Sequence, residues 1–154
     1  MITSWRIVKA KYATAAFDGE GARIAGGRWN SRGRTVVYTS ESAALAALEL
    51  LVHLGRSRSL PDYVIFSCSF SEKLIETLQP EDLPTNWRSY PAPARLARLG
   101  NTWLRERRSA VLRVPSAVIE TESNYLLNPN HPQFRRIAIS KPEPFELDLR
   151  LLRQ

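Results

Sequence analysis

The chain has 154 residues, of which 44% are hydrophobic and 24% are charged, and this composition predicts one ordinary globular domain over residues 1–154. Cys68 is the only cysteine, which excludes an intrachain disulfide and disfavours a cysteine-based zinc site. No apolar run is long enough to span a membrane, and residues 1–6 lack the features of a signal peptide. We therefore expect a soluble, cytoplasmic protein.

The positive charge raises the question of a nucleic-acid partner. A net charge of +7 and an isoelectric point near 10.1 fit a basic nucleic-acid-binding module or a small RNase. The arginines are scattered, however, and no DNA- or RNA-binding signature appears. Arginine binds phosphate and carboxylate groups in general, so a nucleotide ligand or an acidic partner fits equally well. A non-catalytic domain that docks a partner and an ordinary solvated basic surface are the remaining alternatives.

The first third of the chain predicts two strands followed by a helix. Residues 5–10 alternate loosely between apolar and polar side chains, and residues 35–39 are a β-branched run, so both are expected to be strands separated by a glycine-rich loop. Ser40 has the residue type of a helix N-cap, and Gly55 has that of a helix stop. We therefore predict a helix over residues 41–54.

The remainder predicts more strands than helices. Residues 63–70 are expected to be a strand, and residues 94–108 a helix with a basic outer face, in which Gly100 is unfavourable. The other predictions are a surface loop over residues 80–93, a strand over 111–119 bent at Pro115, a turn over 128–132, and closing strands over 134–139 and 145–151. The expected class is α+β, with a mixed or antiparallel sheet and a few helices.

The predicted helix over residues 41–54 is the most informative segment. Between Ser42 and Gly55 its only ionisable side chains are Glu49 and His53, and the rest is alanine, leucine and valine nearly all round, which is typical of a buried helix. A buried carboxylate is costly unless it is paired or faces a wet cleft. Glu49 is therefore a candidate catalytic residue, or it pairs with an arginine or with His53, which shares its face. His53 is a secondary candidate.

Arg28 and Tyr38, which precede this helix in the chain, are candidates for binding a ligand. Arg28 follows Gly26 and Gly27, which allow close approach of a ligand, and its guanidinium can fork onto phosphate oxygens. The glycine pattern matches neither the dinucleotide-binding nor the P-loop fingerprint, so a tight turn with a surface arginine explains it equally well. Tyr38 ends the strand that leads into the helix, which places it at the mouth of any cleft above Glu49 or in the core.

Two serines near the other end are less informative. Ser116 follows Pro115, and Ser123 precedes Asn124. Serine and asparagine at such positions are common in turns and caps, so the residues alone indicate a structural role for both serines.

Taken together, these segments resemble the RES-domain family, which is named for its arginine, glutamate and serine. The resemblance covers nearly the whole chain. Its blocks are Gly27-Arg28-Trp29-Asn30, Val37-Tyr38, Ala47-Leu48-Glu49, Val52-His53, Pro115-Ser116, Asn124-Tyr125-Leu126-Leu127-Asn128-Pro129 and His131-Pro132. The resemblance implies a core similar to the ADP-ribosyltransferase fold of diphtheria-like toxins.

The resemblance also implies a function. RES proteins are toxins of type II toxin–antitoxin modules, so this chain is expected to deplete NAD+ as a glycohydrolase or phosphorylase. Some relatives transfer ADP-ribose, which makes a mono-ADP-ribosyltransferase the alternative and leaves water, phosphate or a protein as the acceptor. The implied partner is an Xre-type helix-turn-helix antitoxin, through which DNA is reached indirectly, with a toxin homodimer in the complex. NAD+ is the substrate and inorganic phosphate a co-substrate, without a prosthetic group.

Roles for individual residues follow from the resemblance. Cleavage of the nicotinamide–ribose bond builds positive charge on the ribose, and Glu49 is the residue type that stabilises it. Arg28 is expected to grip the pyrophosphate or a ribose hydroxyl, and Tyr38 to pack against nicotinamide. Nicotinamide is a good leaving group, so no strong general acid and no metal are required.

The family serine has two candidates in this chain. Ser116 is favoured, but Ser123 stays open, and either serine with Asn124 is expected to orient the bound nucleotide. Arginines that are candidates for docking an acidic antitoxin tail are Arg32, Arg34, Arg56 and Arg58.

Overall fold

A mixed sheet organises residues 1–55 and 60–152, which are the residues that the computed structural model describes. The strand order is β4-β5-β6-β2-β1-β3-β7, and β8 also pairs with β3. Among these pairs only β4 and β5 run parallel. The strands are β1 (Ile2–Lys9), β2 (Val37–Ser40), β3 (Tyr63–Phe70), β4 (Ile75–Thr77), β5 (Val111–Pro115), β6 (Ser123–Leu127), β7 (Ala138–Ile139) and β8 (Glu143–Phe145). This sheet confirms the predicted α+β class.

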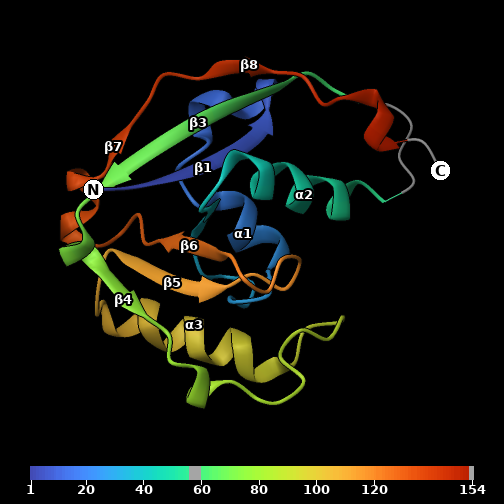
Figure 1. The fold of residues 1–154 in the computed structure, drawn as a ribbon. Coiled ribbons are helices and arrows are strands. Elements are labelled where there is room, and N and C mark those ends of the chain that lie inside the picture. The colour runs from blue at the N-terminus through green and yellow to red at the C-terminus, as the bar shows by residue number, and fades with distance from the viewer. Residues whose placement is uncertain (56–59, 153–154) are drawn as a thin grey trace.

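Within residues 1–55 and 60–152, three α-helices and several short 3-10 helices accompany the sheet. They are α1 (Glu20–Ala25), α2 (Ala43–Leu54), α3 (Ala94–Glu106), η1 (Ala10–Ala15), η2 (Glu72–Leu74), η3 (Pro80–Asp82), η4 (Pro132–Arg136) and η5 (Leu149–Leu152). In Figure 1, α3 runs along β4 and β5 at one edge of the molecule, whereas α2 ends near η5. Within the described part of the chain, no helix is both long and apolar enough to cross a membrane.

The strands β5 and β6 separate two clusters of buried side chains, because successive side chains of a strand point to opposite faces of the sheet. Val111 and Leu127 pack into the cluster that β3 also supplies. Leu112 and Leu126 point the other way and pack against α3, where Trp103 is fully buried. Helix α3 is thus fixed by the core to one face of these strands.

Gly100 lies in the middle of α3 and is explained by a close contact. A Cβ atom at this position would lie 1.8 Å from the carbonyl oxygen of Trp29. Only glycine therefore lets the helix approach the backbone of the segment that carries Arg28. The sequence pattern counted Gly100 against the helix, but α3 forms with Gly100 at its closest contact.

The predicted helix over residues 41–54 forms, with two corrections. Its N-cap is Ser42 rather than Ser40, because the Ser42 hydroxyl accepts a hydrogen bond from the Leu45 amide at 3.0 Å. Gly55 ends it as predicted. The expectation of a buried helix is wrong: only Leu45 and Ala46 are buried, and Val52 is 62% exposed. The helix contacts β1 and β2 along one side, so part of its apolar surface stays exposed.

The two predicted closing strands are largely wrong. Over residues 134–139 the chain forms η4, with Pro132 at its start, followed by the two-residue β7. Over residues 145–151, β8 ends at Phe145 and η5 follows. Leu147 is buried, but Leu149 is 67% exposed, so the alternation of leucines does not mark a sheet face. Of these two segments and the residues between them, only Ala138–Ile139 and Glu143–Phe145 pair with β3, so the local pattern overstated the length of both strands.

The segments that the sequence missed lie close to the functional candidates. The expected glycine-rich loop contains α1, and β6 was not predicted although it pairs with both β2 and β5 in the middle of the sheet. The predicted strand over residues 111–119 ends at Pro115, and a turn follows it. Consequently, Ser116 lies just beyond one strand and Asn124 lies in its antiparallel neighbour.

Candidate active site

Glu49 is the centre of a polar cluster formed by residues far apart in the sequence. One carboxylate oxygen, Oε1, accepts hydrogen bonds from the Ser116 hydroxyl at 3.1 Å and from the Asn124 side-chain amide at 3.0 Å. Among the described residues no hydrogen bond reaches the other oxygen, Oε2. Glu49 is partly exposed, so the carboxylate is oriented by two donors and still keeps one oxygen for a ligand.

The hydroxyl of Ser116 is held in one orientation by its own turn. Ser116 is fully buried, and its Oγ accepts hydrogen bonds from the backbone amides of Val118 at 3.0 Å and Ile119 at 3.1 Å. A serine oxygen has two acceptor positions and a single proton. Because both acceptor positions are occupied, the proton is left to donate to Glu49.

Asn124 brings a second donor to Glu49 and an unused acceptor. It lies opposite Ser40 in the β2–β6 pair, so the sheet fixes its position. Its side-chain nitrogen donates to Glu49, whereas its side-chain oxygen is buried and has no hydrogen-bond partner among the described residues. A buried unsatisfied acceptor is costly. This oxygen is therefore a natural partner for a donor on a bound ligand.

Arg28 is fixed by a loop that the sequence treated only as surface. Its Nη1 donates to the backbone carbonyls of Trp87 at 2.8 Å and Ser89 at 3.1 Å. Burial lowers the pKa of the guanidinium, and the negative charge of the nearby Glu49 acts to raise it. The group stays cationic at neutral pH. The positive charge of Arg28 therefore lies near Glu49, and most of its N–H donors remain available to a ligand.

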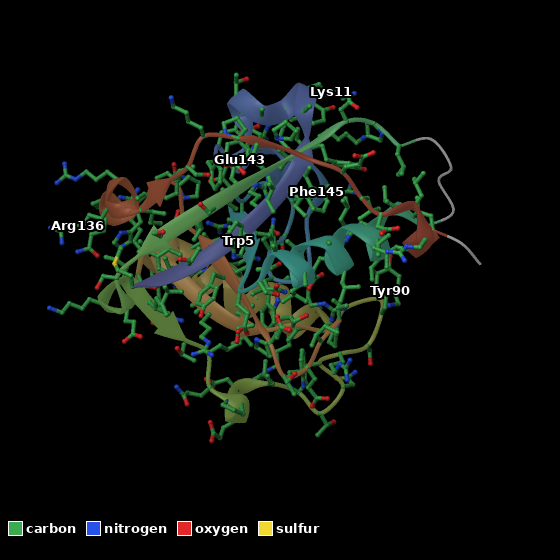
Figure 2. All side chains as sticks on the ribbon, turned by 45° about the horizontal axis from the view of Figure 1, so that its top comes forward. Trp5, Lys11, Tyr90, Arg136, Glu143 and Phe145 are labelled. Carbon is green, nitrogen blue, oxygen red and sulfur yellow. The ribbon has the colours of Figure 1, made fainter. Side chains whose placement is uncertain are left out.

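The loop that holds Arg28 is also tied to the turn after Ser116. Arg88 donates through Nε and Nη2 to the carbonyl of Ala117, at 3.1 and 3.0 Å, and pairs with Glu120 at 3.0 Å. The neighbouring Tyr90 is 91% exposed and stands at the outer end of the loop (Figure 2). The role of this loop carried no signal in the sequence, because backbone acceptors in a proline-rich loop have no recognisable side-chain pattern.

Tyr38 supports the Arg28 segment. Its hydroxyl donates to the Asn30 side-chain oxygen at 2.6 Å and accepts from the Trp29 amide at 3.1 Å. Burial raises the pKa of this phenol far above its ordinary value, so Tyr38 is neutral. A Cβ atom on Gly27 would lie 2.7 Å from the Tyr38 oxygen. The Gly-Arg-Trp-Asn block is therefore a tight turn closed by a tyrosine.

Two predicted candidates lie outside this cluster. The Ser123 hydroxyl accepts a hydrogen bond from Arg113 at 3.1 Å, and its amide donates to the carboxylate of Glu41. His53 is exposed, and its Nδ1 contacts the backbone carbonyl of Glu49 at 2.7 Å. Neither side chain has a hydrogen bond to the Glu49 carboxylate, so the geometry groups Ser116, and not Ser123, with Glu49.

The cluster combines an anionic and a cationic group with oriented amide and hydroxyl donors. In the parts of the chain that the structure covers, no three His, Cys, Asp or Glu side chains are placed to hold a metal ion. A carboxylate with a free oxygen stabilises positive charge that develops on a substrate, and an arginine beside it binds a phosphate group. The arrangement suits an anionic substrate whose reacting centre becomes cationic.

Comparison with known proteins shows the family of this chain. The RES domain matches residues 3–148, and the chain belongs to this family. A protein named "Toxin Res" from Yersinia enterocolitica is 43% identical over 148 residues, which cover 96% of this chain and 97% of that protein. A protein named "Prs ADP-ribosylating toxin" from a Sphingobium species is 35% identical over 167 residues and covers 100% of this chain and 99% of its own length.

A solved structure confirms the fold. The crystal structure of the M. tuberculosis MbcT–MbcA toxin–antitoxin complex contains a chain that superposes with a TM-score of 0.78, covering 94% of this chain and 84% of that one. The sequence identity is 16%, so this likeness concerns the fold alone. It is consistent with the ADP-ribosyltransferase-like core that the family resemblance implied.

Proposed function

We propose that the chain is the toxin of a toxin–antitoxin module and that it cleaves the nicotinamide–ribose bond of NAD+. The observation that carries this proposal is the Glu49 carboxylate, with one oxygen fixed by Ser116 and Asn124 and the other without a partner among the described residues. The names of the Yersinia and Sphingobium relatives support the toxin assignment, and the second name supports NAD+ as the substrate.

The residues divide the work of cleavage as follows. Departure of nicotinamide builds positive charge on the ribose carbon and ring oxygen. The free oxygen of Glu49 stabilises that charge or accepts a proton from a ribose hydroxyl. The remaining N–H groups of Arg28 bind the pyrophosphate. The unpartnered oxygen of Asn124 accepts a hydrogen bond from the substrate. Tyr38 packs against nicotinamide with its ring, because its hydroxyl already holds Trp29 and Asn30.

The acceptor of ADP-ribose separates the candidate reactions. Water gives a glycohydrolase and inorganic phosphate gives a phosphorylase. A protein side chain gives a mono-ADP-ribosyltransferase, which the name of the Sphingobium relative favours as the second candidate. All three share the first bond cleavage, so the Glu49 cluster serves each of them.

Proton NMR of NAD+ incubated with the protein tests this proposal. We expect nicotinamide release by the parent chain and by Glu72→Gln, a matched change at an exposed glutamate, but not by Glu49→Gln. An ADP-ribose 1-phosphate product that requires added phosphate identifies a phosphorylase, and free ADP-ribose identifies a glycohydrolase. Intact NAD+ in every sample, together with no labelled protein when labelled NAD+ is added to lysate, would reject the proposal.

We also propose an antitoxin of the Xre helix-turn-helix type as the partner, with two toxin copies in the complex. Support for an antitoxin partner comes from the solved neighbour, which is itself a toxin–antitoxin complex, whereas the Xre type and the two copies rest on the family resemblance. Light scattering of the toxin, alone and with the product of an adjacent gene, measures both stoichiometries. A monomeric toxin that forms no complex with that product would contradict this part.

A further inference from the structure

A second polar site lies at the end of β2 and β6 opposite to Glu49. A cavity of about 260 Å³ is lined there by Arg34, Arg105, Arg107, Asn128 and Asn130, together with a few uncharged neighbours. We call these five residues the basic pocket. Arginine and asparagine side chains supply N–H donors, and no carboxylate lines the cavity. The basic pocket therefore has the chemistry of an anion site.

Strand pairing separates the basic pocket from the candidate active site. Asn124 pairs with Ser40 at one end of the β2–β6 ladder, and Leu127 pairs with Val37 at the other end. Asn128 follows directly after the second pair. Four residues of extended chain span about 13 Å. None of the five residues of the basic pocket therefore belongs to the Glu49 cluster, and the proposed cleavage assigns no role to them.

The three arginines of the basic pocket lack partners within the described residues. Within that part of the chain, the side chains of Arg34, Arg105 and Arg107 form no hydrogen bond or ion pair, whereas the nearby Arg108 pairs with Glu76 at 2.8 Å. Three cations around one concave surface repel each other and focus a positive potential into it. An anionic ligand relieves this repulsion.

Arg107 also occupies a backbone conformation that usually belongs to glycine. It is the C-cap of α3, with φ 51° and ψ 41° in the left-handed region, and it is the only non-glycine residue at positive φ in the described part of the chain. Glycine is strongly preferred at such a position because other residues are strained there. An arginine retained at this cost is expected to use its side chain, and Arg107 lines the basic pocket.

The positive surface continues along α3 from the basic pocket. Arg98 and Thr102 line another cavity, of about 200 Å³. They precede Arg105 by seven and three residues, so all three share one face of the helix. Seven residues of helix rise about 10 Å. Arg95, Leu99 and the paired Arg108 also line this second cavity. Two arginine-lined cavities along one helix suit an extended chain of anions better than a single small ion.

We propose that this face of α3 binds the phosphate backbone of a nucleic acid. The 260 Å³ of the basic pocket is below the roughly 300–1,000 Å³ that encloses a drug-sized ligand, so it admits a phosphate group of a larger molecule rather than a whole nucleotide. Arginine forks match phosphate oxygens, and asparagine side chains also donate to them. The toxin itself contacts the nucleic acid, in addition to any contact made by an antitoxin.

The test measures binding of a fluorescein-labelled DNA duplex of random sequence by anisotropy, across about 50 to 200 mM salt. The full chain carries Glu49→Gln so that its production is not limited by toxicity. We compare it with the triple variant Arg34→Ala, Arg105→Ala, Arg107→Ala. The matched control removes three exposed lysines, Lys9, Lys11 and Lys141, of which Lys11 lies on η1 next to β1 (Figure 2).

The triple variant should weaken DNA binding about tenfold or more and reduce the slope of log K against log salt by about 2 to 3, because each phosphate contact contributes about 0.9. The control should change the slope by less than about 1. Replacing the same three arginines by lysine should restore most of the slope, since the charges remain. Equal losses in the triple variant and the control would overturn the proposal, and so would an unchanged triple variant.

Two competitors identify the kind of anion. If inorganic triphosphate displaces the DNA at a lower phosphate concentration than unlabelled duplex, the pocket serves a small phosphate ligand and the proposal fails. If polyglutamate displaces it better than unlabelled duplex, the surface serves an acidic protein and the proposal fails. NAD+ cleavage by the triple variant with Glu49 intact is expected at the parent rate. A chain that binds DNA but leaves NAD+ intact would reject only the proposed function.

Discussion

The two ends of β2 and β6 carry polar groups in opposite states. At the Glu49 end, hydrogen bonds orient the charged groups: Ser116 and Asn124 donate to the carboxylate, and carbonyl groups accept from Arg28. At the basic pocket, Arg34 and its two neighbouring arginines have no partner in the described residues. One short pair of strands thus separates a hydrogen-bonded cluster from a group of arginines with excess positive charge.

This difference reflects two kinds of task. Stabilising a short-lived charge requires groups that are already oriented, because reorientation during the reaction costs free energy. Binding a polyanion requires only excess positive charge, and much of the gain comes from the release of counterions. The same α+β scaffold therefore supplies rigid hydrogen-bonded residues at one end and exposed arginines at the other. The substitutions below are expected to affect the Glu49 cluster, the basic pocket, both or neither.

The largest effect is expected for Glu49→Gln. The substitution keeps size and polarity but removes the negative charge that stabilises the developing cation, so nicotinamide release should fall by a factor of about 10²–10³, or about 3–4 kcal/mol in the barrier. DNA binding at the basic pocket should be unchanged. A rate within a few-fold of the parent, with the fold intact by circular dichroism, would remove Glu49 from the mechanism.

Gly100→Ala should disturb both ends. The added methyl group would clash with the Trp29 carbonyl oxygen, so α3 must move away from the segment that carries Arg28. We expect a loss of about 2–3 kcal/mol in the free energy of unfolding, which urea denaturation measures. Gly21→Ala is the matched control, because nothing lies within 4 Å of its added Cβ in α1. It should be neutral or slightly stabilising, and equal losses in the two variants would contradict the packing argument.

Ser116→Ala should affect only the Glu49 end. It removes one donor to the carboxylate and leaves the amides of Val118 and Ile119 without their acceptor, so nicotinamide release should fall about tenfold and stability by about 1–2 kcal/mol. Ser123→Ala serves as the control, because its hydroxyl contacts Arg113 instead. Kinetics of both variants also decide between the two serine candidates, and a larger loss of rate in Ser123→Ala would reverse the choice.

The sequence predicted the parts of this molecule that depend on local patterns. The strand over residues 63–70 and the stop of α2 at Gly55 follow from residue type and spacing. The choice of Glu49 as a catalytic residue stays a prediction, and the helix that carries it is less buried than expected. The contacts that orient Glu49 could not be predicted, because Asn124 lies in a strand whose pairing depends on the whole sheet. The loop that binds Arg28 acts through backbone carbonyls, which any sequence provides.

The basic pocket shows a second limit of the same kind. Arg34 and Arg105 are far apart in the sequence, and their scattering argued against a nucleic-acid surface, but the fold brings them to one cavity. Among the arginines considered for an acidic tail, Arg32 lies beside this region in the sequence. Arg56 and Arg58 lie outside the described residues. Charge clusters built from distant segments become visible only once the strand ends are placed.

The smallest effect is expected for Arg107→Gly, which should change the two properties of the basic end in opposite directions. Glycine relieves the strain of the left-handed conformation at the end of α3, and its greater freedom in the unfolded chain offsets part of that gain. The free energy of unfolding should therefore rise by about 0.5 kcal/mol. The same change removes one phosphate contact and should lower the salt slope of DNA binding by about 1. Arg105→Gly, inside the helix at helical φ, is the comparison: it should also lower the slope but destabilise the protein by about 1 kcal/mol. If Arg107→Gly stabilises the fold and leaves DNA binding unchanged, the strained arginine is not retained for binding, and the basic pocket loses its strongest structural argument.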